Sequence, residues 1–393
     1  MSLGHTTMKQ LPSLTHMLTR LIAQPSVSSV SPEFDMGNRA LIDELAGWCE
    51  AAGFAVEITP IEGHPDKANL VATLGRGPGG LVLAGHTDTV PCDPGLWRQD
   101  PFRLTERDGR LYGLGTSDMK SFLALALEAA RGLEADQFHQ PLVILATADE
   151  ESSMAGAKAI RAAGRPLGRH AIIGEPTGMR PVRMHKGIIM EAVRITGRSG
   201  HSSDPRLGNN ALEGMHKAIA EILAWRHELQ QRYSNPLFKV ATPTLNLGHI
   251  HGGDNPNRIC GHCELHIDLR PLPGMDLDEL RETMETRLAR TLADTGLGLE
   301  VFRLFDGTPA METPADAPIV RAAEMLTGHP AEAVAFGTEG PYLRDLDMDV
   351  VVLGPGDIEQ AHQPDEYLAL DRIPPTLDML RSLITSFCLK PAR

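Results

Sequence analysis

The chain has 393 residues and a formal net charge of −14, from 37 basic and 51 acidic side chains. This length exceeds what one compact core usually organises, so we expect about two domains. The acidic balance argues against nucleic-acid binding, which needs clusters of Lys and Arg. No stretch approaches the roughly 18 consecutive apolar residues of a membrane-spanning helix, and the N-terminus lacks a secretory pattern, so we expect a cytoplasmic protein with no membrane partner.

Helical and strand patterns alternate along the first 180 residues and again after residue 300. This alternation predicts an α/β fold with a mainly parallel sheet and helices on both faces. The expected helices cover residues 40–52, 122–133 and 319–326, and the expected buried strands cover residues 81–84, 142–146, 171–173 and 350–353.

The middle third has a different order, β-α-β-β-α. Its expected strands cover residues 188–195, 243–250 and 258–269, and its expected helices cover residues 211–229 and 277–292. This order predicts a smaller inserted α+β domain of ferredoxin-like type. We therefore expect one domain to comprise residues 1–182 and 295–393, and the insertion to comprise residues 183–294.

Five cysteines form an odd, scattered set, which suits a reducing compartment. Cys260 and Cys263 have the spacing of a zinc knuckle. Polar and apolar residues alternate over 258–269, however, and strand pleating would place the two sulfurs on opposite faces. We favour the strand over the metal knuckle.

Acidic and histidine motifs follow the expected buried strands. His86 and Asp88 come after strand 81–84, Glu150 and Glu151 after strand 142–146, Glu175 after strand 171–173, and His362 beyond strand 350–353. Carboxyl ends of strands share one edge of an open α/β sheet, so these side chains are expected to meet there. Asp118 precedes an expected helix, and taken alone it reads as a helix N-cap.

Such a cluster of acids without cations would be costly, because repulsion and burial disfavour the ionised forms. Two divalent metal ions would remove that cost. Imidazole and carboxylate ligands without thiolate favour zinc, cobalt or manganese. We expect two ions, with Zn²⁺ favoured and Co²⁺ as the alternative.

Five motifs, in this order and spacing, resemble the di-zinc aminoacylase and carboxypeptidase family of metallopeptidases. The motifs are Gly-His-Thr-Asp-Thr-Val-Pro (85–91), Gly-Leu-Gly-Thr-Ser-Asp-Met-Lys (113–120), Ala-Asp-Glu-Glu (148–151), Gly-Glu-Pro-Thr (174–177) and Ser-Gly-His-Ser-Ser (199–203). The resemblance implies a metal-binding catalytic domain and an inserted dimerisation or lid domain.

The resemblance also implies a role for each site residue and a cis peptide after Asp118. The implied roles are His86 and Glu175 on the first metal, Glu151 and His362 on the second, Asp118 as the bridging carboxylate, Glu150 as the general base, and Asp88 as the group that orients His86. If the chain is near-extended at Glu150 and Glu151, their side chains diverge and can do different work. The alternative for this pair is a solvated acidic turn.

More narrowly, residues 184–187, 243–253, 257–260 and 354–367 resemble the family members that remove the acetyl group from N2-acetyl-L-ornithine in arginine biosynthesis. Related members act on N-succinyl-diaminopimelate, acetylcitrulline or dipeptides, so the N-acyl amino acid substrate stays open. The resemblance makes His201 an oxyanion donor in the partner subunit's site, which predicts a homodimer, and Asn257 and Arg258 contacts for the substrate carboxylate. The alternatives are a solvated histidine and a surface ion pair. Glu339 is a candidate partner for the substrate ammonium group.

Overall fold

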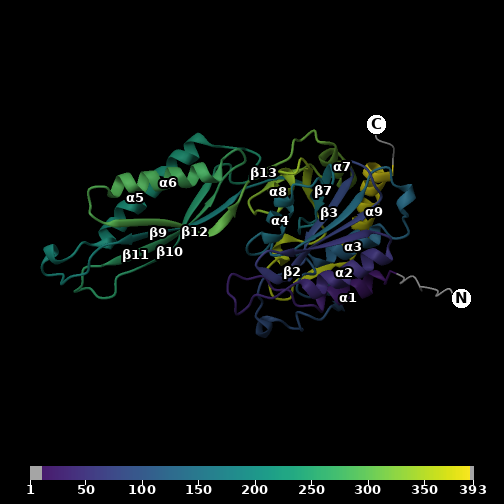
Figure 1. The fold of residues 1–393 in the computed structure, drawn as a ribbon, viewed down its shortest axis with the longest axis horizontal. Coiled ribbons are helices and arrows are strands. Elements are labelled where there is room, and N and C mark those ends of the chain that lie inside the picture. Colours follow the sequence, from purple (N-terminus) through teal and green to yellow (C-terminus); the bar gives the residue numbers. More distant parts are fainter. Residues whose placement is uncertain (1–10, 390–393) are drawn as a thin grey trace. The chain divides into compact units, whose positions relative to one another are not determined.

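The computed structural model describes residues 11–389, which fold into two compact units (Figure 1). The first unit contains the chain up to Arg183, Thr313–Glu332 and the chain from Glu339 onward, and the second contains Met184–Glu312 and Ala333–Thr338. The insertion thus ends later than the expected residue 294. Strand β12 (Gly298–Thr308) causes the difference, because it pairs with the second unit's own sheet.

The first unit is built on a sheet with a parallel centre, as the alternation predicted. Strands β6, β3, β7 and β15 run parallel to one another, whereas the flanking pairs β1–β2, β2–β6, β15–β8 and β8–β13 are antiparallel. The order is β1-β2-β6-β3-β7-β15-β8-β13, with β14 beside β8. The bounds are β1 (Ala55–Ile61), β2 (His64–Leu74), β3 (Leu81–His86), β6 (Leu142–Thr147), β7 (His170–Ile173), β8 (Val182–His185), β13 (Met311–Glu312), β14 (Glu332–Val334) and β15 (Asp349–Val352).

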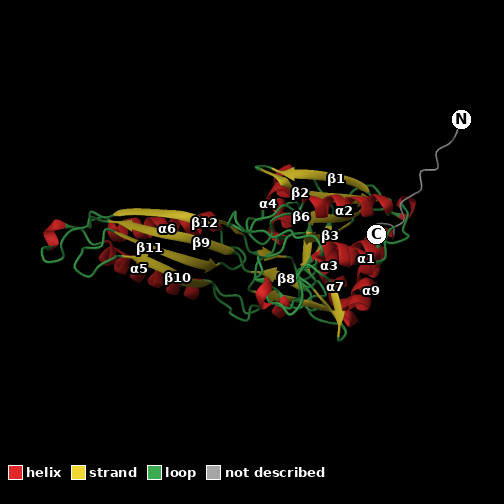
Figure 2. Cartoon of the chain, turned by 90° about the horizontal axis from the view of Figure 1, so that it is seen from below, coloured by secondary structure: helices red, strands yellow, loops and turns green. Residues whose placement is uncertain are grey.

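Helices cover both faces of this sheet (Figure 2). Every residue of β3 and β6 is buried, which is the expected pattern for strands covered on two sides. Helix α3 packs on β3 and β6 and is flanked by α1 and α9, while α4 packs against α8, and α8 against β15. The bounds are α1 (Leu14–Ile22), α2 (Arg39–Ala51), α3 (Lys120–Ala129), α4 (Ala155–Ala163), α7 (Pro318–Thr327), α8 (Gly340–Arg344) and α9 (Ile373–Ile384).

A small antiparallel sheet lies in the loops of the first unit. Its order is β16-β5-β4, with bounds β4 (Thr105–Arg107), β5 (Arg110–Tyr112) and β16 (Tyr367–Ala369). This pairing joins the segment that follows His362 to the segment that precedes Asp118.

The second unit is an antiparallel sheet with helices α5 and α6 packed on it. The sheet order is β10-β11-β9-β12, and the chain order β-α-β-β-α-β adds one strand, β12, to the expected pattern. The remaining bounds are β9 (Ile188–Thr196), α5 (Ala211–Arg232), β10 (Thr244–Gly252), β11 (His262–Arg270) and α6 (Leu277–Leu292). Along β11 buried and half-exposed residues alternate, which is typical of a sheet with one covered face.

The expected opposite placement of Cys260 and Cys263 is wrong. Strand β11 begins at His262 rather than at residue 258, so Cys260 lies before the strand and is not subject to its alternation. Both cysteines are buried in the core of the second unit. Within residues 11–389, neither belongs to a group of side chains that could hold a metal.

None of the helices in the described part of the chain has the length and apolar character needed to cross a bilayer.

Candidate metal centre

The structure brings the strand-end motifs of the first unit together into two groups of ligand atoms. Within residues 11–389, the atoms offered by His86, Asp118 and Glu175 lie within 4.8 Å of one another, and so do those of Asp118, Glu151 and His362. His86 ends β3, and Glu175 follows β7, so neighbouring parallel strands bring these two side chains to one sheet edge, whereas Asp118 comes from the loop before α3.

Asp118 belongs to both groups. Its Oδ1 lies 3.1 Å from His86 Nε2, and its Oδ2 lies 3.6 Å from His362 Nε2. One carboxylate thus turns an oxygen toward each group, which is the arrangement that a bridging ligand requires. The helix-cap interpretation is wrong, because α3 begins at Lys120 after Met119 at the N-cap position. The Asp118–Met119 peptide is cis, as the resemblance implied.

His86 is oriented by a main-chain oxygen as well as by a carboxylate. Its Nδ1 lies 2.9 Å from the backbone oxygen of Asp88 and 3.7 Å from Asp88 Oδ1. If Nδ1 carries the proton and donates it to that carbonyl oxygen, Nε2 keeps its lone pair on the side of Asp118 and Glu175. Glu175 Oε1 is 3.8 Å from this nitrogen.

The carboxylate of Asp88 has a second task that its sequence position did not reveal. It accepts hydrogen bonds from the backbone N–H groups of Glu150, at 3.2 Å, and of Glu151, at 3.0 Å. Asp88 therefore ties the loop after β3 to the turn that presents both glutamates.

Glu150 and Glu151 have different surroundings. Glu151 Oε1 and Oε2 both lie 3.1 Å from His362 Nε2, and this places Glu151 in the second group. Loss of hydration, followed by the nearby Glu175 carboxylate, raises the pKa of Glu150 well above its ordinary value. Glu150 belongs to neither ligand group, which leaves its carboxyl available for proton transfer.

The charges of the centre favour bound protons or cations. Burial, then Asp118, raises the pKa of Glu175 well above normal. Burial opposes a charge on His86, but its hydrogen bond with Asp118 and the carboxylates of Glu175 and Asp88 outweigh this effect and raise the His86 pKa. The donor set of two imidazoles and three carboxylates, without thiolate, fits a pair of zinc-like divalent ions.

A buried lysine beside the centre was missed by the sequence analysis. Lys67 Nζ lies 2.7 Å from Asp35 and 2.8 Å from Asp149, the residue before Glu150. Asp149 has a positive φ of 56° and also accepts a hydrogen bond from Ser28 at 3.0 Å. In the sequence, Lys67 stands directly before the mostly apolar second half of β2, and a charged residue at such a position indicates a buried ion pair.

Glu339 also lies in the first unit, but in its interior. It is 1% exposed, and its Oε2 accepts a hydrogen bond of 2.7 Å from Thr147 Oγ1 at the end of β6. Its Oε1 has no hydrogen-bond partner among the described residues. Burial raises the pKa of Glu339 to about 7.

The other candidate residues lie together in the second unit and not in the ligand groups. His201 forms an isolated backbone bridge with Arg258, and its Nδ1 is 2.7 Å from Ser203 Oγ. The carbonyl oxygen of Asn257 accepts a hydrogen bond from the Ser202 N–H at 3.0 Å. Arg258 pairs with Asp254 at 2.6 Å, so the surface ion pair considered as the alternative is present.

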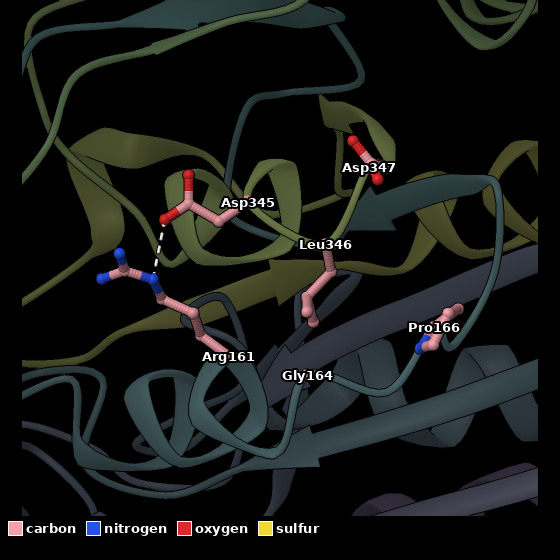
Figure 3. Close-up of a pocket in the computed structure, with 6 residues that line it drawn as sticks. All are labelled: Arg161, Gly164, Pro166, Asp345, Leu346 and Asp347. Atoms are coloured by element: carbon pink, nitrogen blue, oxygen red, sulfur yellow. Dashed lines mark ion pairs between the residues drawn. The ribbon is translucent and has the colours of Figure 1, made fainter.

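A separate open pocket of the first unit contains none of these residues (Figure 3). It lies at the ends of α4 and α8, where Arg161 Nε is 2.8 Å from Asp345 Oδ2. Both side chains of this pair are about half exposed, which is typical of a surface ion pair.

Comparison with known proteins places these features in a family. The sequence pattern of "Peptidase family M20/M25/M40" matches residues 82–386. An acetylornithine deacetylase of Edwardsiella ictaluri (strain 93-146) is 52% identical over 379 residues, which cover 96% of this chain and 99% of that protein. An acetylornithine deacetylase of Pasteurella multocida (strain Pm70) is 49% identical, with 97% and 100% covered.

Two solved structures share the fold. An M20 family metallo-carboxypeptidase of Sulfolobus solfataricus superimposes with a TM-score of 0.75 at 18% identity, over 96% of this chain and 99% of that one. An aminopeptidase of Bacillus cereus gives 0.73 at 21% identity, over 96% and 98%.

Proposed function

The chain belongs to the M20/M25/M40 peptidase family, and within it we propose a metal-dependent amidohydrolase that removes the acetyl group from N2-acetyl-L-ornithine. The products would be L-ornithine and acetate, the former a precursor for arginine biosynthesis. The observation that carries the proposal is the position of Asp118 between two ligand groups with Glu150 beside them, in a chain about half identical to acetylornithine deacetylases.

The proposed ligands of one ion are His86 and Glu175, those of the other are Glu151 and His362, and Asp118 is shared. Bound at these residues, divalent ions, for which Zn²⁺ is proposed and Co²⁺ is the alternative, would supply Lewis-acid chemistry and would lower the pKa of a water molecule from 15.7 towards about 7. Glu150 would accept a proton from the attacking water and would pass it to the amine nitrogen as the bond between that nitrogen and the acetyl carbon breaks. Asp88 keeps Glu150 in place through the backbone of its turn.

The second unit is proposed to supply substrate contacts. The exposed guanidinium of Arg258 and the neighbouring Asn257 suit a carboxylate, and the exposed pair of Arg258 with Asp254 is worth little, so exchange for a substrate carboxylate costs little. His201 is proposed as the oxyanion donor in the site of a partner subunit, which makes the functional form a homodimer. Glu339 stays a prediction for the substrate ammonium, and because it is buried, direct contact requires that its side chain become accessible.

The substrate is tested with purified protein supplied with zinc or cobalt. We expect the highest kcat/KM with N-acetyl-L-ornithine, compared with N-succinyl-diaminopimelate, N-acetyl-citrulline and simple dipeptides. A higher kcat/KM with another of these substrates would reassign the substrate within the family, and turnover by fully chelated protein would contradict the metal-dependent mechanism.

The contribution of His201 across subunits is tested by mixing two inactive variants. Glu150→Gln lacks the proposed base and His201→Ala lacks the proposed donor, so each homodimer should be nearly inactive. After random exchange of subunits, each mixed dimer would hold one intact site, and activity should return to about a quarter of the wild-type value. Absence of recovery, with subunit exchange verified by mass spectrometry, would contradict the proposal.

A further inference from the structure

Glu366 is a buried carboxylate that holds the loop carrying Asp118. It is 1% exposed and lies four residues after His362. Its Oε1 accepts hydrogen bonds from the backbone N–H groups of Ser117, at 2.6 Å, and Asp118, at 2.9 Å, and its Oε2 accepts one from Gly115 at 2.9 Å. Three hydrogen bonds of this kind, from donors within four residues, fix the main chain that leads into Asp118.

The same glutamate also belongs to the segment that carries His362. Its backbone oxygen accepts a hydrogen bond from the Gly113 N–H at 3.1 Å, and the next residues form β16, which pairs with β5. The Glu366 side chain and main chain together join the loop of Asp118 to the segment that follows His362.

We propose that Glu366 is a positioning residue that sets the spacing between Asp118 and His362, and through it the affinity for the second metal ion. This inference rests on the proposed function in taking these two residues as metal ligands. Glu366 acts through the backbone of residues 115–118, and its own bonds are to N–H groups.

A carboxylate suits this position better than any other side chain of the same size. Both carboxyl oxygens of Glu366 act as acceptors here. A glutamine would turn an NH₂ group toward at least one backbone N–H, leaving buried donors facing each other. An aspartate keeps the charge but is one methylene shorter, so it cannot reach all three donors from the same backbone position.

The second ion should depend on Glu366 more than the first. His86 is the last residue of β3, a strand that pairs with β6 on one side and with β7 on the other. Glu175 lies two residues after the end of β7. His362, by contrast, has a side chain that is 52% exposed and lies between a short 3-10 helix, Ile358–Gln360, and β16. The position of His362 is thus fixed less by strand pairing than that of His86. Loss of the Glu366 hydrogen bonds should therefore displace His362 more and weaken the second ion more.

The test compares Glu366→Gln with Glu106→Gln, a control on β4, where Glu106 is exposed in the same small sheet. Metal-free proteins are titrated with Zn²⁺ against a competing chelator, and with Co²⁺ followed by its visible absorption. We expect the control to match the wild type. For Glu366→Gln we expect a weakening of roughly 10- to 100-fold in the second equivalent only, with an altered Co²⁺ spectrum for that equivalent. Excess metal should restore most of kcat.

Unchanged affinity for both equivalents would overturn the proposal. An equal loss at both would also overturn it, because it would mean that Glu366 acts only on the shared Asp118 and not on the spacing between Asp118 and His362. If Glu366→Gln does not fold, Glu366→Asp decides in its place: it should weaken the second equivalent selectively, and wild-type binding would overturn the proposal. A wild-type protein that binds two ions but does not cleave N-acetyl-L-ornithine would contradict the proposed function, while the titrations would still decide the role of Glu366.

Discussion

Glu150 and Glu151 are adjacent carboxylates in one turn, yet only Glu151 contacts His362. Asp88 fixes the backbone of both, so the separation of their side chains is built into the main chain rather than left to rotamers. The same three-residue acidic run can therefore supply a metal ligand and a base.

Replacement of Glu150 by Gln should separate catalysis from metal binding. The amide cannot accept the proton of the attacking water, so kcat should fall by about 10²- to 10⁴-fold. Metal stoichiometry should be unchanged, because Glu150 belongs to neither ligand group. The matched variant Glu151→Gln should instead lose affinity for one ion. Turnover and zinc content are the measurements, and near-normal turnover of Glu150→Gln would remove this residue from the mechanism.

His185 should make the second unit sensitive to acid. It is fully buried, its Nδ1 lies 2.8 Å from the Lys186 backbone oxygen and its Nε2 lies 3.1 Å from Thr338 Oγ1, and burial lowers its pKa to about 4. In the unfolded chain the imidazole takes up a proton below about pH 6.5, whereas in the folded protein it does so only near pH 4. The free energy of unfolding therefore falls as pH drops from 6.5 towards 4. At pH 5 the loss is about 2 kcal/mol.

The measurement is the unfolding temperature of metal-free protein at pH 7.5 and pH 5. His185→Asn should lower it at both values but reduce its dependence on pH. His216→Asn, at an exposed position of α5, should leave that dependence as in the wild type. An equal pH dependence in all three proteins would show that His185 does not titrate in this way.

At the scale of elements, buried ionic contacts connect strands to the turns that carry function. Lys67, on β2, is only 3% exposed and binds Asp149 in the turn after β6. This contact joins an antiparallel flanking strand to the turn of Glu150, so the positions of the glutamates depend on more than the strand that precedes them.

Replacement of Lys67 by Met should therefore be strongly destabilising. It leaves the buried Asp149 carboxylate without its cation, at a cost of about 3–5 kcal/mol. Arg39→Met is the matched control, because Arg39 pairs with Asp43 at 2.8 Å on an exposed helix surface and should change stability by less than about 1 kcal/mol. Urea unfolding of both variants gives the comparison. Similar losses would mean that the Lys67 contact is worth no more than a surface pair.

At the scale of the whole molecule, the metal centre couples folding to both metal and pH. Burial and neighbouring carboxylates raise the pKa of Glu150 and Glu175, and carboxylates also raise that of His86 against the effect of burial. Without metal the folded protein thus holds protons that the unfolded chain releases. Its stability is present at low pH and is lost as pH rises through these raised values.

Removal of metal should consequently lower the unfolding temperature, and the gap between loaded and metal-free protein should widen as pH rises from 6 to 9. A free metal concentration of 100 times Kd raises the free energy of unfolding by about 2.7 kcal/mol per site. Calorimetry with and without chelator measures the gap. A gap that narrows with rising pH would contradict the assignment of these acids to a cation site.

Much of the fold was readable from local pattern. Continuous apolar runs identified β3, β6, β7 and β15, because strands covered on both faces must be apolar throughout. Strand β12 was missed, since most of its residues are exposed or half-exposed and no clear alternation marks it. The missed strand placed the end of the insertion too early, and the return of Ala333–Thr338 to the second unit left no local pattern either.

The sequence by itself determined the chemistry of the centre: which imidazoles and carboxylates follow buried strands, and in which order. Tertiary structure alone decided which oxygen faces which nitrogen, that Asp118 is shared rather than a helix cap, and that Lys67 and Glu366 support the loops around it. Ligand type and strand position are local properties of the chain, and they leave a pattern. A contact such as that of Glu366 with Asp118 joins residues 248 positions apart, and it exists only once the loops are folded against each other.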